Sequence, residues 1–169
     1  IESVWWSLSE IWKKGLLVQD HRVAPYCPRC GTGLSDHELA QGYETVTDPS
    51  VYVRFPVTSG KFAQLKASLL VWTTTPWTLV SNTAVAVNPQ VTYVVARIKN
   101  DESSEVVIVA EDLIARVSPE HEVLEKVLGK DLEKTTYERP FDLVEIPNSH
   151  FVVLADYVTV DDGTGLVHQ

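Results

Sequence analysis

The stretch ASLLVWTTTPWTLVSN, residues 67–82, carries the clearest structural signal in the chain. Its apolar first half ends in β-branched and aromatic residues, which favours a buried strand. Because a strand alternates its side chains, Thr73 and Thr75 are expected on one side and Thr74 on the other. Pro76 has no backbone donor, so the strand should end before it and leave hydroxyls and free backbone groups at a rim. By spacing alone an ordinary strand end explains the threonines equally well, although such rims often bind ligands.

Five further runs of the same character follow residue 43, separated by Gly, Pro and Asn. They are SVYVRF (50–55), TAVAV (83–87), VTYVVARI (91–98), EVVIVA (105–110) and FVVLADYVTV (151–160). This number of short strands predicts a closed or strongly curved β structure.

Helical spacing occurs in three places, one before the strand region and two within it. In ESVWWSLSEIWKK (2–14) the apolar residues recur at helical intervals, and Gly15 marks the expected end. A second helix is predicted in PEHEVLEKVLG (119–129), where Val123, Val127 and Leu128 share one face of a helix and Gly129 offers a stop. A third, short helix is predicted at VAEDLIARV (109–117).

The composition bears on nucleic-acid binding, on membrane association and on the role of the cysteines. Fourteen Lys and Arg against 23 Asp and Glu give a net charge of −9, so any nucleic-acid contact must be local. The apolar runs fall far short of the roughly 20 residues of a membrane span, so no membrane partner is expected, and no secretory leader is recognisable. Both cysteines, Cys27 and Cys30, form one C-x-x-C in a turn-rich knuckle, which suits a metal or a redox pair in a reducing cytoplasm.

A second polar rim is predicted at VDDGTGLVHQ, residues 160–169. Gly163, Thr164 and Gly165 form a tight turn that leads into a short strand ending at His168. Taken alone, the turn is weak evidence for ligand binding, and a lone histidine is more often structural. Two such rims at the ends of apolar strands can nevertheless converge on one pocket in a curved sheet.

Together, WTTTPWTL, NTAVAVNP, GTGLVH and PYCPRCGTGLSDHELAQGY resemble the editing insertion, connective polypeptide 1, of isoleucyl-tRNA synthetases. The resemblance implies an α/β fold: a β-barrel-like editing domain with peripheral helices over residues 43–169, preceded by a connecting helix and half of a zinc knuckle over residues 1–42. Its function would be hydrolysis of valine wrongly joined to tRNA(Ile) or to adenylate, with isoleucine excluded by size. The partners would be the acceptor end of tRNA(Ile), valine and the synthetic domain of the same enzyme.

The resemblance also implies roles for individual residues. Thr73, Thr74, Thr75 and His168 would be catalytic, with the threonines around the terminal adenosine and His168 limiting the side-chain size. The substrate-binding residues would be Trp77, Thr78, Asn82, Gly163, Thr164 and Gly165. The aspartate that holds the substrate's ammonium group would lie beyond Gln169, so that the domain is truncated at its C-terminus. Asp161 and Asp162 are not expected to replace it.

Cys27 and Cys30 would supply half of a zinc site in the full-length enzyme, and the hydrolysis itself needs no cofactor. His21 and His37 lie near the cysteines in the sequence, but their spacing fits no zinc pattern. Two alternatives remain from the sequence. One is the editing domain of the valyl or leucyl branch, and the other is a non-catalytic zinc-knuckle and barrel module that binds RNA or protein.

Overall fold

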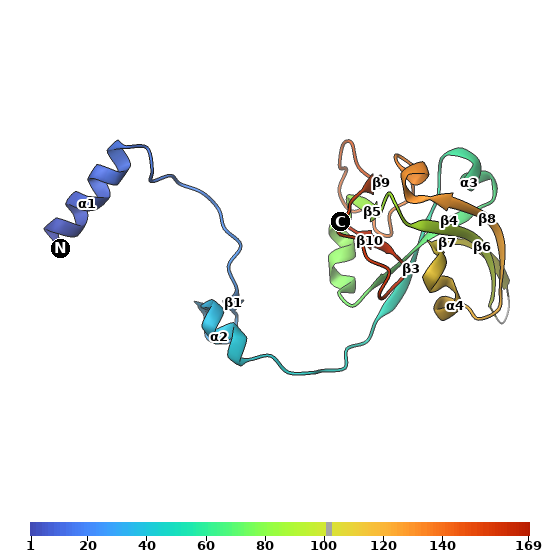
Figure 1. Cartoon of the computed structure of the whole chain (residues 1–169), viewed down its shortest axis with the longest axis horizontal. Coiled ribbons are helices and arrows are strands. Elements are labelled where there is room, and N and C mark those ends of the chain that lie inside the picture. The colour runs from blue at the N-terminus through green and yellow to red at the C-terminus, as the bar shows by residue number, and fades with distance from the viewer. Residues whose placement is uncertain (101–102) are drawn as a thin grey trace. The chain divides into compact units, whose positions relative to one another are not determined.

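A computed structural model describes residues 1–100 and 103–169, which divide into two compact units, Ile1–Thr47 and Asp48–Gln169 (Figure 1). The first unit contains helix α1 (Glu2–Lys13), the short antiparallel pair β1 (Tyr26–Cys27) and β2 (Thr32–Gly33), and helix α2 (Asp36–Gln41). α1 ends at the expected place, just before Gly15, whose φ is +68°. No helix in the described ranges has the length and apolar character to cross a membrane.

The second unit is built on two sheets. A five-stranded sheet has the order β3-β4-β7-β6-β8, and a three-stranded sheet has the order β10-β5-β9. The strands are β3 (Val51–Pro56), β4 (Ala67–Thr73), β5 (Ala84–Val87), β6 (Thr92–Asn100), β7 (Ser103–Ala110), β8 (His121–Leu128), β9 (Phe151–Leu154) and β10 (Leu166–His168). The β4–β7 and β5–β9 pairs are parallel and the others are antiparallel.

Short helical segments connect these strands. They are α3 (Gly60–Gln64), α4 (Ile114–Val117) and the 3₁₀ turns η1 (Pro76–Ser81), η2 (Glu111–Leu113) and η3 (Gly129–Leu132). The short helix expected within residues 109–117 is therefore confirmed as α4.

The core of the second unit lies on the inner faces of these strands. Its fully buried side chains include Phe55, Leu69, Tyr93, Ile108 and Val152, which come from five different strands. The predicted α/β fold with peripheral helices is confirmed, but the prediction of a closed barrel is wrong. Among the described residues the strands form separate five- and three-stranded sheets, and no hydrogen-bonded ladder closes them into one.

The helix predicted at residues 119–129 is also wrong, because residues 121–128 form strand β8. This strand pairs with β6 from Thr92 opposite Leu128 to Ile98 opposite His121. Val127 is buried, whereas Val123 and Leu128 are about 40 % exposed (41 % and 39 %), so the three residues share no buried face. Pairing with β6 at the edge of the sheet therefore outweighed the helical propensity of the local Glu, Leu and Lys residues.

The strand predicted over residues 151–160 is shorter in the structure. β9 ends at Leu154, and residues 155–159 turn away from the sheet. Asp156, a turn-forming residue in the middle of the run, is the local signal for this break.

Candidate functional site

The threonine rim forms where β4 ends at Thr73 and η1 begins at Pro76. The Oγ1 atoms of Thr73 and Thr75 are 3.2 Å apart, so these two side chains share one side, as predicted. The backbone N–H of Thr75 donates to Thr73 Oγ1 at 3.1 Å. The hydroxyl of Thr78 lies 3.2 Å from that of Thr75, so Thr73, Thr75 and Thr78 form one line of hydroxyls.

The glycine turn leads into β10, which pairs antiparallel with β5. Gly163 and Gly165 have φ values of +75° and +73°, which residues with a Cβ atom rarely adopt. A Cβ on Gly165 would lie 2.5 Å from the Cβ of Ala110, so the turn packs directly against the end of β7. The backbone N–H of Ala110 donates to Thr164 O at 2.9 Å and holds the turn in place.

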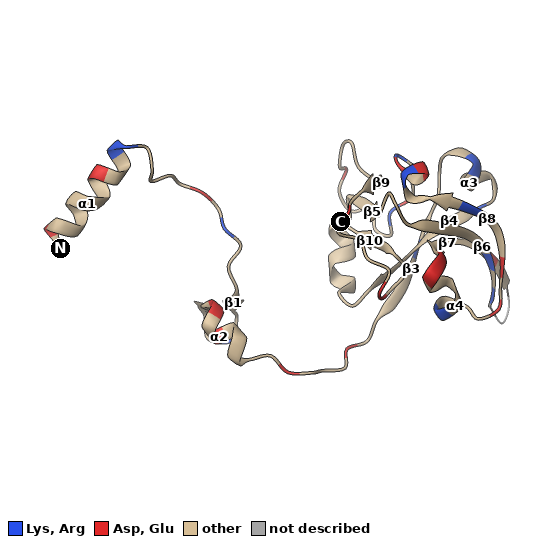
Figure 2. Ribbon diagram, in the orientation of Figure 1, with Lys and Arg blue, Asp and Glu red and all other residues tan. Residues whose placement is uncertain are grey.

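The two rims meet at a cavity of about 560 Å³, as the sequence predicts. His168 Nε2 lies 3.2 Å from Thr78 Oγ1, although 90 residues separate the two in the chain. The cavity is lined by Trp72, Thr73, Thr74, Thr75, Thr78, Ser81, Tyr157, Val158, Thr159, Asp162, Gly165, Val167, His168 and Gln169. Asp162 is the one Asp, Glu, Lys or Arg in this lining, and Figure 2 shows η1, β5 and β10 free of both charge colours.

The hydrogen bonds fix the direction in which Thr78 donates. Thr78 Oγ1 lies 2.7 Å from the carbonyl oxygen of Thr75, which can only accept, so the single hydroxyl proton is directed there. The contact with His168 therefore requires Nε2–H as the donor and Thr78 Oγ1 as the acceptor. In this arrangement His168 does not act as a base toward Thr78, and Thr78 is not an activated nucleophile.

The surroundings of His168 favour its neutral form. Burial lowers the pKa of His168 below its ordinary value of 6.5. Because Nε2 carries the proton, Nδ1 is an unprotonated acceptor, and this atom is buried with no hydrogen-bond partner in the described structure. The hydroxyl of Thr164, which is 1 % exposed, is likewise buried without such a partner.

Several residues expected in the site do not line the cavity. Asn82 is buried, and its side chain binds Tyr137 and the carbonyl oxygens of Ala84 and Gln169. Trp77 is 69 % exposed and borders a separate hollow of about 150 Å³. Gly163 lies against the ring of Trp72, where a Cβ would approach within 3.0 Å.

Other lining residues were not assigned from the sequence. They include Trp72 and Ser81, which flank the threonines, and residues 157–159, which the sequence places in a strand. The turn after β9 brings residues 157–159 to the cavity, and Asp156 was the local signal for that turn. Asp162 also lines the cavity, and its carboxylate accepts from Arg116 at 3.0 Å.

Cys27 and Cys30 lie in the first unit, at the β1–β2 hairpin, and both are free thiols. The backbone N–H of Cys30 donates to Cys27 Sγ at 3.3 Å, and this hydrogen bond lowers the pKa of the Cys27 thiol. Two thiols at this spacing suit a pair of metal ligands. Within residues 1–100 and 103–169, however, no group of three or more His, Cys, Asp or Glu is arranged to hold a metal.

Comparison with known proteins finds relatives that match the whole chain. It is 66 % identical over 172 residues to the isoleucine–tRNA ligase of Streptomyces coelicolor, 65 % to that of Thermobifida fusca and 51 % to that of Thermus thermophilus. Each alignment covers 100 % of this chain and 16 % of the relative, so the chain spans a small part of their length. No family model matches the chain.

Solved structures of editing domains share the fold of this chain. The crystal structure of GlLeuRS-CP1 superposes with a TM-score of 0.59 at 25 % identity, covering 70 % of this chain and 53 % of that one. The editing domain of the P. knowlesi cytosolic leucyl-tRNA synthetase gives a TM-score of 0.55 at 15 % identity, covering 70 % and 57 %. The whole chain therefore matches one segment of isoleucine–tRNA ligases, and it has the fold of a CP1 editing domain.

Proposed function

We propose that the chain is the editing segment of an isoleucine–tRNA ligase and hydrolyses valine that has been wrongly joined to tRNA(Ile) or to adenylate. The observation that carries the proposal is the cavity between the threonine rim and His168, because it joins the two motifs that prompted the family assignment. The relatives at 51 % to 66 % identity are isoleucine–tRNA ligases, which favours this branch over the valyl and leucyl ones. The acidic chain and a cavity lining without Lys or Arg speak against a module that binds RNA over a broad surface.

The need for such a site follows from the size of its substrates. A pocket that accepts isoleucine cannot strongly exclude valine, because one methylene contributes only about 1–3 kcal/mol of discrimination. A second cavity can reject isoleucine by steric overlap and admit the smaller valine. His168 and Thr78 form the part of the cavity wall that we assign to this size limit.

We assign the nucleophile to water rather than to a side chain. The hydroxyl proton of Thr78 is directed to Thr75 O, and neutral His168 donates to Thr78, so the Thr78–His168 pair does not form a nucleophile and base. The hydroxyls of Thr73, Thr74 and Thr75 can donate to and accept from the ribose, the ester carbonyl and the attacking water. The vicinal hydroxyl of the substrate's own ribose would then assist the water.

Substitution of a threonine tests this function in the full-length enzyme. Thr75→Val keeps the side-chain shape and removes one hydroxyl from the line, so hydrolysis of valyl-tRNA(Ile) should fall by about tenfold or more while isoleucylation persists. The control is Thr45→Val, which changes an exposed threonine in the first unit. Equal deacylation rates in Thr75→Val, Thr45→Val and wild type would contradict the assignment.

The remaining partners follow from the family. The acceptor end of tRNA(Ile) would enter the cavity with the aminoacyl group, and the synthetic domain would be supplied by the rest of the enzyme, in the cytoplasm where tRNA is charged. Cys27 and Cys30 would provide two of four zinc ligands, and the others would come from elsewhere in the full-length chain. A zinc bound there would stabilise the first unit, and hydrolysis in the second unit would need no cofactor.

A further inference from the structure

Two buried tyrosine hydroxyls lead to the segment that carries His168, one directly at Gly165 and one through Asn82 at Gln169. The first point is Gly165, whose carbonyl oxygen accepts from Tyr93 Oη at 2.7 Å. Tyr93 is fully buried at the start of β6, and its hydroxyl also accepts from the backbone N–H of Asn88 at 3.0 Å. Burial raises the pKa of Tyr93 to about 12, so the hydroxyl remains a donor at neutral pH.

The ring of Tyr93 has little freedom to move. Two glycines approach opposite edges of the ring: a Cβ on Gly129 would lie 3.0 Å from Tyr93 Cε2, and one on Gly165 would lie 3.6 Å from Cε1. Close packing on both sides directs the hydroxyl to Gly165 O. The ring therefore sets the position of the turn from which β10 starts.

The second point is Gln169, which Tyr137 reaches through Asn82. Tyr137 Oη donates to Asn82 Oδ1 at 2.7 Å, and both residues are buried. Because the amide oxygen faces Tyr137, the amide Nδ2 is directed to the carbonyl oxygens of Gln169 at 3.2 Å and Ala84 at 2.9 Å. This bond orients Asn82 toward the backbone at the end of β10.

Tyr137 is itself held in place by its neighbours. Its ring contacts Phe55 edge-on, with the ring centroids 5.2 Å apart. Burial raises the pKa of Tyr137, so its hydroxyl also stays protonated. The loop 138–150 ends beside Tyr137, where the backbone N–H of Tyr137 donates to His150 O at 3.1 Å.

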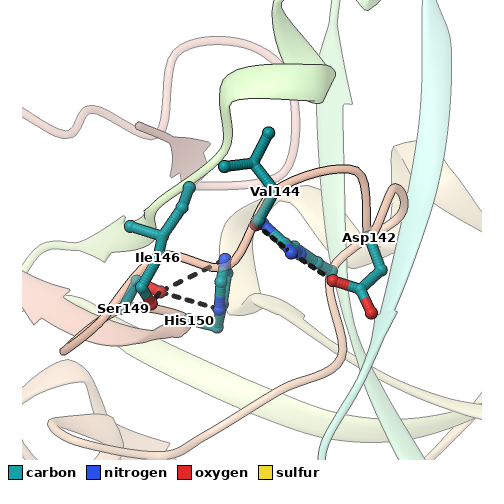
Figure 3. A network of polar contacts seen from close by, with 6 residues as sticks. Asp142, Val144, Ile146, Ser149 and His150 are labelled. Atoms are coloured by element: carbon teal, nitrogen blue, oxygen red, sulfur yellow. Dashed lines mark hydrogen bonds and ion pairs between the residues drawn. The ribbon is translucent and has the colours of Figure 1, made fainter.

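This loop is organised by its own polar contacts (Figure 3). The guanidinium of Arg139 donates to the carboxylate of Asp142 and to the carbonyl oxygen of Val144. Ser149 Oγ donates to Ile146 O at 2.6 Å and lies 2.8 Å from His150 Nδ1. These contacts keep the loop closed next to Tyr137, and the backbone N–H of His150 donates to Thr83 O at 2.7 Å, beside Asn82.

The two anchor points bracket the residue that we assign to the size limit. β10 has only three residues and lies at the edge of its sheet, so its ladder with β5 is short. The His168 ring has one side-chain partner, Thr78, among the described residues. Its position in the cavity therefore depends on the backbone between Gly165 and Gln169.

We propose, on the basis of the editing function above, that Tyr93 and Tyr137 are positioning residues. Their hydroxyls fix the two ends of the segment 165–169 and thereby set His168 against Thr78. Neither tyrosine lines the cavity, so each acts on the substrate through the position of His168. Loss of either hydroxyl should loosen the cavity wall and admit the larger isoleucyl group.

The test uses the full-length enzyme with Tyr93→Phe, Tyr137→Phe and the double variant, each of which keeps the packed ring. The readout is the ratio of deacylation rates for isoleucyl-tRNA(Ile) and valyl-tRNA(Ile), measured as kcat and KM beside the melting temperature. We expect each single variant to raise the ratio by about fivefold, which corresponds to about 1 kcal/mol, the contribution of one neutral hydrogen bond. The double variant should raise it further.

Two controls separate positioning from general destabilisation. Tyr52→Phe removes the hydroxyl of an exposed tyrosine on β3 and should leave the ratio unchanged. Ile98→Ala opens a core position at the far end of β6 from Tyr93, and should lower the melting temperature without raising the ratio.

The possible results separate failure of the positioning role from failure of the proposed function. A melting temperature lowered by Tyr93→Phe and Tyr137→Phe with the wild-type ratio, as for Ile98→Ala, overturns the positioning role. If wild-type enzyme does not cleave the valyl ester faster than the isoleucyl ester, the proposed function itself fails. Should the double variant not fold, the two single variants decide.

Discussion

The Nε2 atom of His168 lies 3.2 Å from the Oγ1 atom of Thr78, a contact between the end of β10 and the 3₁₀ turn that follows β4. This contact closes one side of the cavity, and the bond from Thr78 to the carbonyl of Thr75 ties it to the threonine rim. A steric wall built in this way depends on the positions of two elements, β10 and η1, rather than on one side chain alone. The size limit set by this wall can be tested with variants of its residues.

Removal of the His168 ring should relax specificity rather than simply abolish activity. In the full-length enzyme, His168→Ala should increase cleavage of correctly charged isoleucyl-tRNA(Ile) by about tenfold or more, because the wall no longer excludes one methylene. A deacylation assay with both esters at equal enzyme concentration measures this. His121→Ala, a histidine at the distant end of β8, serves as the control. A variant that leaves the isoleucyl ester intact and cleaves the valyl ester at the wild-type rate would remove His168 from the size limit.

The stability of the chain should depend on pH through His168. Its native pKa lies below 6.5, so the unfolded chain binds a proton more readily as the pH falls through that value. The contribution to the free energy of unfolding is therefore complete above about pH 6.5 and is lost below it, down to the lowered native pKa. Denaturant unfolding at a series of pH values should show a shallower acid decline for His168→Gln than for wild type. Thr45→Val, at an exposed position of the first unit without a titratable side chain, should retain the wild-type slope, and a wild-type slope in His168→Gln would disprove the prediction.

Gly165 should tolerate no side chain, for two separate reasons. Its φ of +73° costs an L-residue about 1–2 kcal/mol, and overlap with Ala110 adds about 1–3 kcal/mol. Gly60 has a similar φ of +68° with nothing within 4 Å of a Cβ, so Gly60→Ala should show only the first cost. Chemical denaturation of both variants gives the difference. Equal losses would mean that the turn does not pack on β7 as described.

Zinc binding should depend on the full-length enzyme. Two thiolates form a weak site, whereas four ligands release much more binding free energy, so this chain alone should lose zinc to a chelator. The full-length enzyme should retain it, and Cys27→Ser should lower its zinc content. Metal analysis after dialysis measures all three. Zinc that the isolated chain holds through chelation would show that the half-site expectation is wrong.

Local sequence alone determined several elements correctly. The β-branched runs predicted β3 to β7, the helical spacing before Gly15 predicted α1, and Pro76 predicted the end of β4. These features depend on backbone sterics and on side chains within a few residues, so the local sequence is enough to predict them. The glycines of the GTG turn belong to the same class, since their positive φ values are a local requirement.

The tertiary structure decided the rest. Residues 121–128 became a strand because β6 offered a partner, and the barrel stayed open because β10 pairs with β5 rather than with the larger sheet. Asn82 turned inward to Tyr137, and Trp77 stayed outside the cavity, although both stand beside the threonines in the sequence. Strand pairing, burial and side-chain orientation are set by residues far away in the sequence, up to 90 positions for Thr78 and His168, and local propensity contains no information about such partners.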